Sequence, residues 1–193
     1  SSKSSDLKLY ATPCAFFQLG YFNGLPDEVK ALGCEPDFNA YTGKPNPKPN
    51  TTEPFRTGSG HIHIGWTDGI EDPQEEQHFN VCCEIVRELD FVLYNSSLMW
   101  DKEDKRRELY GAPGAFRPKK YGLEYRVLSN AWLNAEATQR FVYAASKAVA
   151  VRYFKGFKPA SGLYNFHPLK FSDYCDFLSS QRLPNIQNFM SAH

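Results

Sequence analysis

The feature that most constrains the fold is an alternation of polar and apolar residues in the stretch GSGHIHIGW, residues 58–66. His61 and His63 alternate with Ile62 and Ile64, which is the period-two pattern of a β-strand with one apolar face and one face carrying both imidazoles. Same-face side chains two residues apart on a strand stand roughly 7 Å from each other. One metal ion, or a metal and a substrate, can therefore be met by both histidines. A solvent-facing strand that carries two histidines by chance is the equally weighted alternative.

A second period-two segment, LEYRVL at residues 123–128, carries Glu124 and Arg126 on one face and apolar residues on the other. An antiparallel sheet would bring the polar faces of the two strands onto one concave surface. Glu124 with one of the histidines then forms a divalent-metal site suited to Mn²⁺ or Mg²⁺. The alternative for Glu124 and Arg126 is that they are only cross-strand partners of other charges.

Two longer segments have the apolar spacing of helices. Residues 72–75, DPQE, form a capping box with proline at the first helical position, and the helix that they open runs to about Tyr94. Asn134 is expected to cap a second helix that runs to about Phe154 and stops at Gly156. Together with the alternating segments, these helices predict an α+β fold.

The N-terminal part has weaker patterns. Residues 7–19 indicate one or two short strands, and residues 25–32 indicate a short helix stopped by Gly33. The proline-rich residues 34–55 indicate an extended loop. The five cysteines have no paired spacing, so we expect reduced thiols, with adjacent Cys82 and Cys83 in the core.

Residues 102–126 are basic, with eight Lys or Arg against four Asp or Glu, in a chain of zero net charge. Glycines interrupt this stretch, which predicts loop and strand rather than helix. Arginines beside a metal are a usual means of holding phosphates or carboxylates, which points to phosphoryl chemistry. A solvated charged loop is the alternative. The sequence contains no G-x-x-x-x-G-K-[ST], H-E-x-x-H, paired C-x-x-C or G-x-S-x-G motif.

The ordered series RTGSGHIHIGW and RRELYGAPGAFRPKKYGLEYRVLSNAWL, with the helix between them, resembles the phage-encoded amidoligases over roughly residues 30 to 155. These are the phiEco32-like carboxylate–amine ligases, type 2, of the glutamine synthetase superfamily. The resemblance implies a curved, mostly antiparallel sheet of the glutamine synthetase catalytic type, with two long helices packed on one side. It also implies an amidoligase-like domain over residues 1–155 and an aromatic-rich extension over residues 156–193.

The resemblance assigns roles to the polar residues. It implies ATP-dependent amide formation through an acyl phosphate, with Mg²⁺ or Mn²⁺ as cofactor and a carboxylate and an amine of unspecified identity as substrates. The implied metal ligands are His61 and Glu124, the implied substrate contacts are His63 and Arg126, and the arginines resembling those that neutralise ATP phosphates are Arg106, Arg107 and Arg117.

One departure from the family pattern concerns the beginning of the chain. Such ligases start with strands that carry a D-P-E-like motif and a further metal-binding glutamate, and nothing before residue 33 contains them. The stretch CEPD, residues 34–37, has a passing likeness but lies where the family has a later loop. We therefore expect either that an N-terminal segment is missing or that this copy has lost part of its site, and we find no second carboxylate in a strand of matching parity near Glu124. The chain alone is then expected to bind metal weakly, to have little activity, and to associate with itself or with the missing segment.

Zero net charge and the lack of a long apolar run predict neither specific nucleic-acid binding nor membrane insertion. The leading hypothesis is a carboxylate–amine ligase encoded by a phage and located in the host cytoplasm or in the virion. A non-catalytic phage protein that keeps the ligase fold for structure or partner binding is the alternative from another class. A metal-dependent hydrolase that uses the same histidine and glutamate residues is a third, weaker hypothesis.

Overall fold

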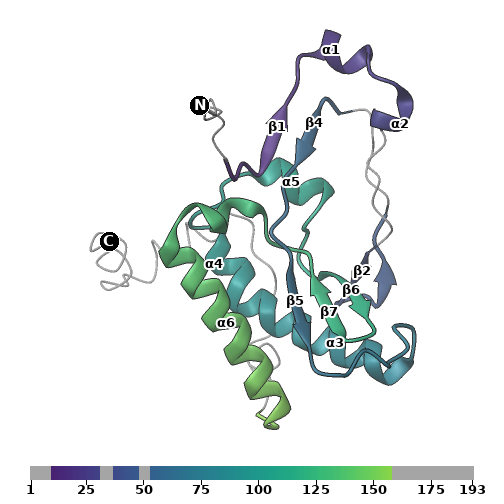
Figure 1. Ribbon diagram of the computed structural model, residues 1–193, viewed down its shortest axis with the longest axis vertical. Coiled ribbons are helices and arrows are strands. Elements are labelled where there is room, and N and C mark those ends of the chain that lie inside the picture. The colour runs from purple at the N-terminus through teal and green to yellow at the C-terminus, as the bar shows by residue number, and fades with distance from the viewer. Residues whose placement is uncertain (1–9, 31–36, 48–52, 158–193) are drawn as a thin grey trace, which may run out of the picture.

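Two antiparallel sheets organise the α+β fold of the computed structural model, which describes residues 10–30, 37–47 and 53–157 (Figure 1). The smaller sheet pairs β1 (Cys14–Phe16) with β4 (Phe55–Thr57). The larger sheet has five strands in the order β3-β2-β6-β7-β5. Its strands are β2 (Phe38–Asn39), β3 (Lys44–Pro45), β5 (Ile62–Gly65), β6 (Ala115–Lys119) and β7 (Gly122–Tyr125).

The register of the large sheet separates polar from apolar side chains. Across β5, β7 and β6, one row aligns His63, Glu124 and Arg117. The next row aligns Ile62 with Tyr125 and Phe116. Since neighbouring residues on a strand point to opposite faces, one face of this sheet is polar and the other apolar. The two alternating segments of the sequence are thus confirmed as neighbouring antiparallel strands.

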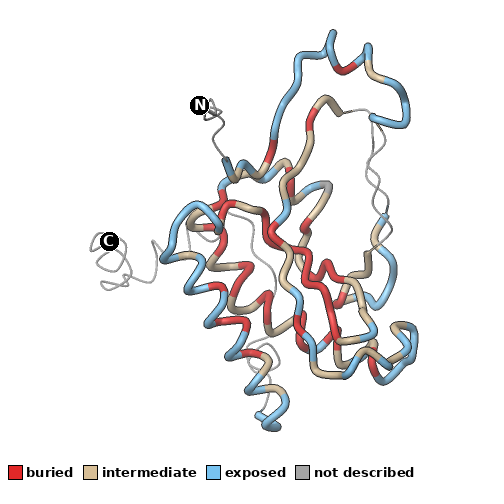
Figure 2. Tube along the Cα trace, in the orientation of Figure 1, coloured by how far each residue is buried: buried red, intermediate tan, exposed pale blue. Residues whose placement is uncertain are grey.

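The two long helices lie on the apolar face. They are α3 (Glu76–Leu89) and α6 (Glu136–Phe154), and α3 contacts both β6 and β7 as well as α6. Figure 2 shows the buried run along β7 and the buried sides of the two helices. The core between them is fully shielded from solvent at its centre, where it includes Ile85, Val86, Leu89, Phe116 and Leu123. The predicted packing of both helices on one side is confirmed.

The long helix α3 does not begin where the sequence predicted. Its N-cap is Glu75, whose side chain accepts a hydrogen bond of 2.7 Å from the backbone N–H of His78. Asp72 instead accepts from the backbone of Gln74 within a turn that precedes the helix. The predicted cap was therefore wrong by three residues, because the turn uses the aspartate first. Beyond Leu89 the helix continues as the π-helix η1 (Asp90–Tyr94) and α4 (Asn95–Ser97).

Two further predictions about helix ends and helix content need correction. Asn134 does not cap α6; it ends the 3₁₀-helix η2 (Asn130–Asn134), and its side-chain amide donates to the carbonyl of Ala11. Within the basic stretch, α5 (Asp104–Leu109) is a helix that was predicted as loop, and the carboxylate of Glu103 caps it. The predicted stop at Gly156 is confirmed, because this residue has a φ of 74° and closes the last turn of α6.

The N-terminal part contains more regular structure than predicted. The strand β1 forms within residues 7–19, of which residues 10–19 are described, as predicted, whereas the helix α1 (Leu19–Asn23) was not predicted. The short helix expected over residues 25–32 is α2 (Asp27–Lys30), and Gly33 lies outside the described residues. The proline-rich stretch contains β2 and β3 where an extended loop was expected. No helix within the described ranges is long and apolar enough to cross a membrane.

The described cysteines are buried thiols. Cys14, Cys82 and Cys83 are free, and burial raises the pKa of Cys14 to about 11 and that of Cys82 to about 12. Such thiols are protonated at neutral pH and behave as small apolar side chains. The core position predicted for Cys82 and Cys83 is confirmed.

Candidate functional site

The polar face of the large sheet gathers most of the residues that the sequence singled out. Glu124 on β7 lies between His63 on β5 and Arg117 on β6. Arg126 follows β7 directly, and its backbone N–H donates to the carbonyl of Ala115, so it lies on the same face one row further along. His61 directly precedes β5, and its imidazole lies beside the guanidinium of Arg126. The strands thus bring together five of the seven predicted residues.

Glu124 is the centre of this face. Its Oε1 lies 2.5 Å from Nη1 of Arg126 and 2.9 Å from Nδ1 of His61, and its Oε2 lies 2.9 Å from Nζ of Lys119. Burial alone would raise the pKa of this carboxyl, but the hydrogen bond from Lys119 and the charges of Arg126 and Lys119 lower it to about 2. Glu124 is therefore ionised at neutral pH although it is almost fully buried.

His61 is a neutral imidazole at pH 7. Burial is the largest cause that lowers its pKa, the positive charge of Arg126 lowers it further, and Glu124 opposes both, with a result of about 4. Its Nδ1 is 3.4 Å from Nη1 of Arg126. A neutral imidazole beside an ionised carboxylate is the donor pair that divalent metals use in proteins.

Asp37 brings a second carboxylate to the site. Its Oδ2 lies 3.2 Å from Nε of Arg126, and its Oδ1 accepts a hydrogen bond from the side chain of Asn46. Asp37 lies outside the strands, so the search for a second carboxylate in a strand of matching parity did not identify it. Asp37 directly precedes β2, which pairs with β6 and so reaches the same face. The signal was the stretch CEPD, whose Glu35 lies outside the described residues.

His63 is more exposed and lies apart from the pairs around Glu124. Its Nδ1 is 2.5 Å from the hydroxyl of Tyr121, which lies in the turn between β6 and β7. Tyr121 and Lys119 were not singled out from the sequence. The alternation of AFRPK in β6, which puts Lys119 on the same face as Arg117, could have identified Lys119.

Arg106 supports the site from the interior. It is 1% exposed and donates from its two terminal nitrogens to the carbonyls of Val127 (2.7 Å) and Leu128 (2.9 Å). Gly111 makes room for it, since a Cβ there would lie 2.2 Å from Nη1 of Arg106, and its φ of 73° also favours glycine. The guanidinium thus holds the chain where it leaves β7, and these bonds do not bring it onto the polar face.

Arg107 is likewise engaged away from the sheet face. Its guanidinium pairs with Asp104 at 3.0 Å and with Asp101 at 3.5 Å, and it also donates to the carbonyl of Asp101. These contacts lie around α5 and the loop before it. Of the three arginines that the sequence connected with phosphates, only Arg117 lies in the row of Glu124.

The residues on this face include donors of the types that divalent metals bind. His61, directly before β5, and Glu124 on β7 offer one nitrogen and one carboxylate, which fit Mn²⁺ or Mg²⁺ by donor type. In the part of the chain that the structure describes, no group of three or more His, Cys, Asp or Glu side chains is arranged to hold a metal ion. A metal here would take most of its ligands from water or substrate.

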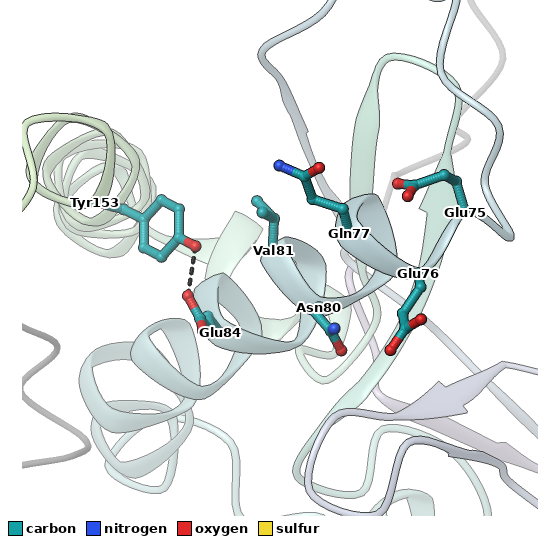
Figure 3. Close-up of a pocket in the computed structure, with 7 residues that line it drawn as sticks. All are labelled: Glu75, Glu76, Gln77, Asn80, Val81, Glu84 and Tyr153. Carbon is teal, nitrogen blue, oxygen red and sulfur yellow. Dashed lines mark hydrogen bonds between the residues drawn. The ribbon is translucent and has the colours of Figure 1, made fainter.

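A separate groove between the start of α3 and the end of α6 has a different character (Figure 3). Its volume is about 410 Å³, and its acidic side chains are Glu75, Glu76 and Glu84. Glu75 caps α3, and Glu84 accepts a hydrogen bond of 2.5 Å from the hydroxyl of Tyr153. Two of these carboxylates are thus used within the fold, and none of the predicted site residues lines this groove.

Fold and site together define an α+β protein whose larger antiparallel sheet carries charged and histidine side chains on one face. Residues 50–160, more than half of the chain, match the family described as phage phiEco32-like COOH.NH2 ligase-type 2, and the chain belongs to this family. Its description indicates a ligase kind of enzyme that joins a carboxylate to an amine. No curated protein and no solved structure matches the chain, so the glutamine synthetase type of sheet stays a prediction.

Proposed function

We propose that this protein is an ATP-dependent carboxylate–amine ligase that activates its carboxylate substrate as an acyl phosphate. The observation that carries the proposal is the polar sheet face itself, where His61, Glu124 and Arg126 lie within 3.4 Å of one another in a chain of the ligase family. Cations, an ionised carboxylate and a neutral imidazole in one place are the groups that phosphoryl transfer needs for positioning and charge stabilisation.

The proposed reaction has two steps. An oxygen of the substrate carboxylate attacks the γ-phosphorus of ATP, and the bond from that phosphorus to the bridging oxygen breaks, which gives an acyl phosphate and ADP. The amine then attacks the acyl carbon, inorganic phosphate leaves, and the amine nitrogen loses a proton. Both steps move negative charge onto phosphate oxygens, which cationic side chains stabilise.

Each residue of the sheet face has a proposed role in this reaction. Arg126 and the exposed His63 bind the substrate carboxylate, with Tyr121 holding the imidazole of His63. We assign the binding of phosphate oxygens to Arg117 and Lys119, which lie on β6 on the same sheet face as Glu124 on β7. Arg106 acts as a positioning residue for the chain after β7.

His61 and Glu124 are the proposed metal ligands. Held by these two residues, Mg²⁺ or Mn²⁺ would supply charge neutralisation for the nucleotide phosphates. A metal held by Glu124 would compete with its cationic partners, Arg126 and Lys119, for the carboxylate oxygens. We propose that the nucleotide phosphates provide the alternative partner for the released cation.

A non-catalytic binding protein is the second candidate, and one observation favours it. The charges around Glu124 already balance within the chain, because Arg126, Lys119 and His61 surround the carboxylate and Asp37 pairs with Arg126. A site closed in this way is also what a fold kept only for partner binding would contain.

Nucleotide binding and turnover separate the two candidates. The experiment measures the melting temperature of the chain with millimolar ATP and Mn²⁺, and then ATP-dependent amide formation with mixed carboxylates and amines. Ligand binding to the folded state predicts a higher melting temperature for the ligase. Arg126→Ala should abolish most turnover, while Arg140→Ala, which changes an exposed arginine of α6, should not. The ligase is rejected if neither a thermal shift nor amide formation is seen.

A further inference from the structure

A second hollow lies directly beside the proposed site, between β5 and α6. Its volume is about 390 Å³, within the usual range for ligand sites. Residues 61–64 form one wall, and α6 forms the other with Val142, Ser146, Lys147 and Ala150. Figure 1 shows α6 running alongside β5, and the two elements are in contact.

The composition of the strand wall shows that the groove follows the edge of β5. Four consecutive residues of an extended segment line it, although neighbouring side chains on a strand point to opposite faces. Only the backbone edge of a strand is shared by residues of both faces. The sheet order agrees, because β5 is the last strand and pairs only with β7.

The direction of the hydrogen bonds identifies the groups at this edge. The backbone N–H of Trp66 donates to the carbonyl of Tyr121 on the β7 side, so the peptide groups of Ile64 point the same way. The N–H and C=O of His63, and the N–H of Gly65, then point away from β7. Both residues are exposed, and within the described ranges no backbone hydrogen bond joins this edge to another segment.

The groove is continuous with the proposed active site. His61 and His63 line it and also lie on the polar face, where His61 is 3.4 Å from the guanidinium of Arg126. An extended peptide is the ligand that an open strand edge binds best, because it satisfies the backbone groups in register. Antiparallel addition, the arrangement of every pair in this sheet, directs the C-terminus of the peptide towards the start of β5.

We infer that the carboxylate substrate is the C-terminus of an extended peptide, which adds to the open edge of β5 and fills the groove against α6. This inference rests on the proposed function. The terminal carboxylate binds Arg126 next to the proposed metal ligand His61, and the small or apolar side chains of Val142, Ser146 and Ala150 accept the peptide's side chains. Lys147 adds a positive charge at the wall.

The test is direct binding of peptides to the whole chain, without nucleotide, by fluorescence anisotropy. The probes are labelled six-residue peptides of alternating valine and threonine that end in valine, leucine, phenylalanine or alanine, each with a free carboxylate. Matched probes carry a C-terminal amide or N-methyl groups at alternate positions. At least one free-carboxylate probe should bind, and the amide and N-methyl forms of that probe should bind about tenfold more weakly.

Two pairs of variants localise the binding. Ala150→Trp fills the groove, whereas Ala148→Trp puts the same side chain on an exposed position of the same helix. Gly65→Pro removes an edge N–H that β7 does not use, and Gly65→Ala keeps it. The first member of each pair should lower peptide affinity about tenfold and the second less than about twofold, with circular dichroism confirming the fold of all four.

The outcomes are distinguishable from those of the proposed function. No binding by any probe at millimolar concentration, or equal binding of the carboxylate, amide and N-methyl forms, overturns the inference, even if small carboxylates support ATP-dependent ligation. Peptide binding without ligation would instead count against the proposed function. If sedimentation shows a dimer that Gly65→Pro dissociates, a second copy covers the edge and the inference is wrong.

Discussion

Two carboxylates on opposite faces of β7 show how differently this fold treats buried charge. Glu124 lies on the polar face among Arg126, Lys119 and His61, and these partners lower its pKa to about 2. Asp90, in the π-helix η1, accepts hydrogen bonds from the hydroxyl of the next strand residue, Tyr125, at 2.7 Å. Burial raises the pKa of Asp90 to about 7, although its hydrogen bonds oppose this.

The difference lies in the donors. Asp90 is fully buried and receives neutral donors, which are the hydroxyls of Tyr125 and Tyr41 and the backbone N–H of Gly114. It joins η1 to β7 and to two loops, and this is a structural role. Glu124 is surrounded by groups that can exchange one partner for another. A carboxylate that remains ionised and has exchangeable partners suits ligand binding.

The largest expected effect is on stability at Asp90. Asp90→Ala should lower the free energy of unfolding by about 4 kcal/mol, because it leaves three buried donors without their acceptor. Urea denaturation measures the change. Asp68→Ala, at an exposed position, is the matched control and should change stability by less than about 0.5 kcal/mol. If Asp90→Ala lowers the free energy of unfolding by less than about 1 kcal/mol, Asp90 does not have the structural role that distinguishes it from Glu124.

The second prediction compares the ligase activity, rather than the stability, of variants at Glu124 and Asp90. Glu124→Gln removes the charge with little change of shape and should lower ATP-dependent amide formation about a hundredfold, or about 2.7 kcal/mol. Folded Asp90→Asn protein should keep its activity within about threefold, since Asp90 does not reach the polar face. Rates are compared at a temperature where circular dichroism shows both variants folded. Equal losses in the two variants would contradict the separation of roles.

The sheet around Glu124 was predictable because the alternation of polar and apolar residues within each strand is a local pattern in the sequence. Alternation alone assigned His61 and His63 to one face of a strand and Glu124 and Arg126 to one face of another, and the sheet has them so. The ends of helices were less predictable, since other hydrogen bonds compete with capping. Asp72 accepts within a local turn, and Asn134 donates to the carbonyl of Ala11, 123 positions away in the sequence. The choice between such bonds depends on neighbours that are distant in sequence.

The residues of the candidate site were predictable only in part, because their contacts also depend on neighbours that are distant in sequence. Asp37 reaches Arg126 across 89 positions of sequence, through strands of two residues that no periodicity reveals. Arg106 and Arg107 share the basic stretch with Arg117, yet α5 directs the first two to backbone carbonyls and to aspartates. Charge in a sequence does not distinguish an arginine that binds a ligand from one that ties down the chain.

A third prediction concerns pH. The pKa of Asp90 is higher in the folded state than in the unfolded chain, so between about pH 4 and pH 7 the folded state holds a proton that the unfolded state has lost. The contribution of this bound proton to the free energy of unfolding is complete below about pH 4 and is lost as pH rises through about 7. The stability of the parent minus that of Asp90→Asn should therefore fall with rising pH, by at most about 1.4 kcal/mol per pH unit.

Urea denaturation at a series of pH values checks this difference. Contributions from Glu124, His61 and other groups are common to both chains and cancel in the subtraction. A difference that is flat between pH 4 and pH 7 would show that Asp90 is ionised throughout, as Glu124 is, and would remove the contrast between the two carboxylates.

The smallest expected effect tests whether the partners of Glu124 are exchangeable. The ammonium of Lys119 lies 2.9 Å from Oε2 of Glu124 and is about one third exposed, so it competes with any metal for that oxygen. Lys119→Met should free the oxygen and tighten Mn²⁺ binding about threefold, measured by isothermal titration in the absence of nucleotide. Lys120→Met changes the adjacent, exposed lysine and should leave the affinity unchanged. Weaker Mn²⁺ binding by the Lys119 variant would mean that the lysine holds Glu124 in position for the metal. The partners of Glu124 would then be as fixed in structure as the hydrogen-bond donors around Asp90.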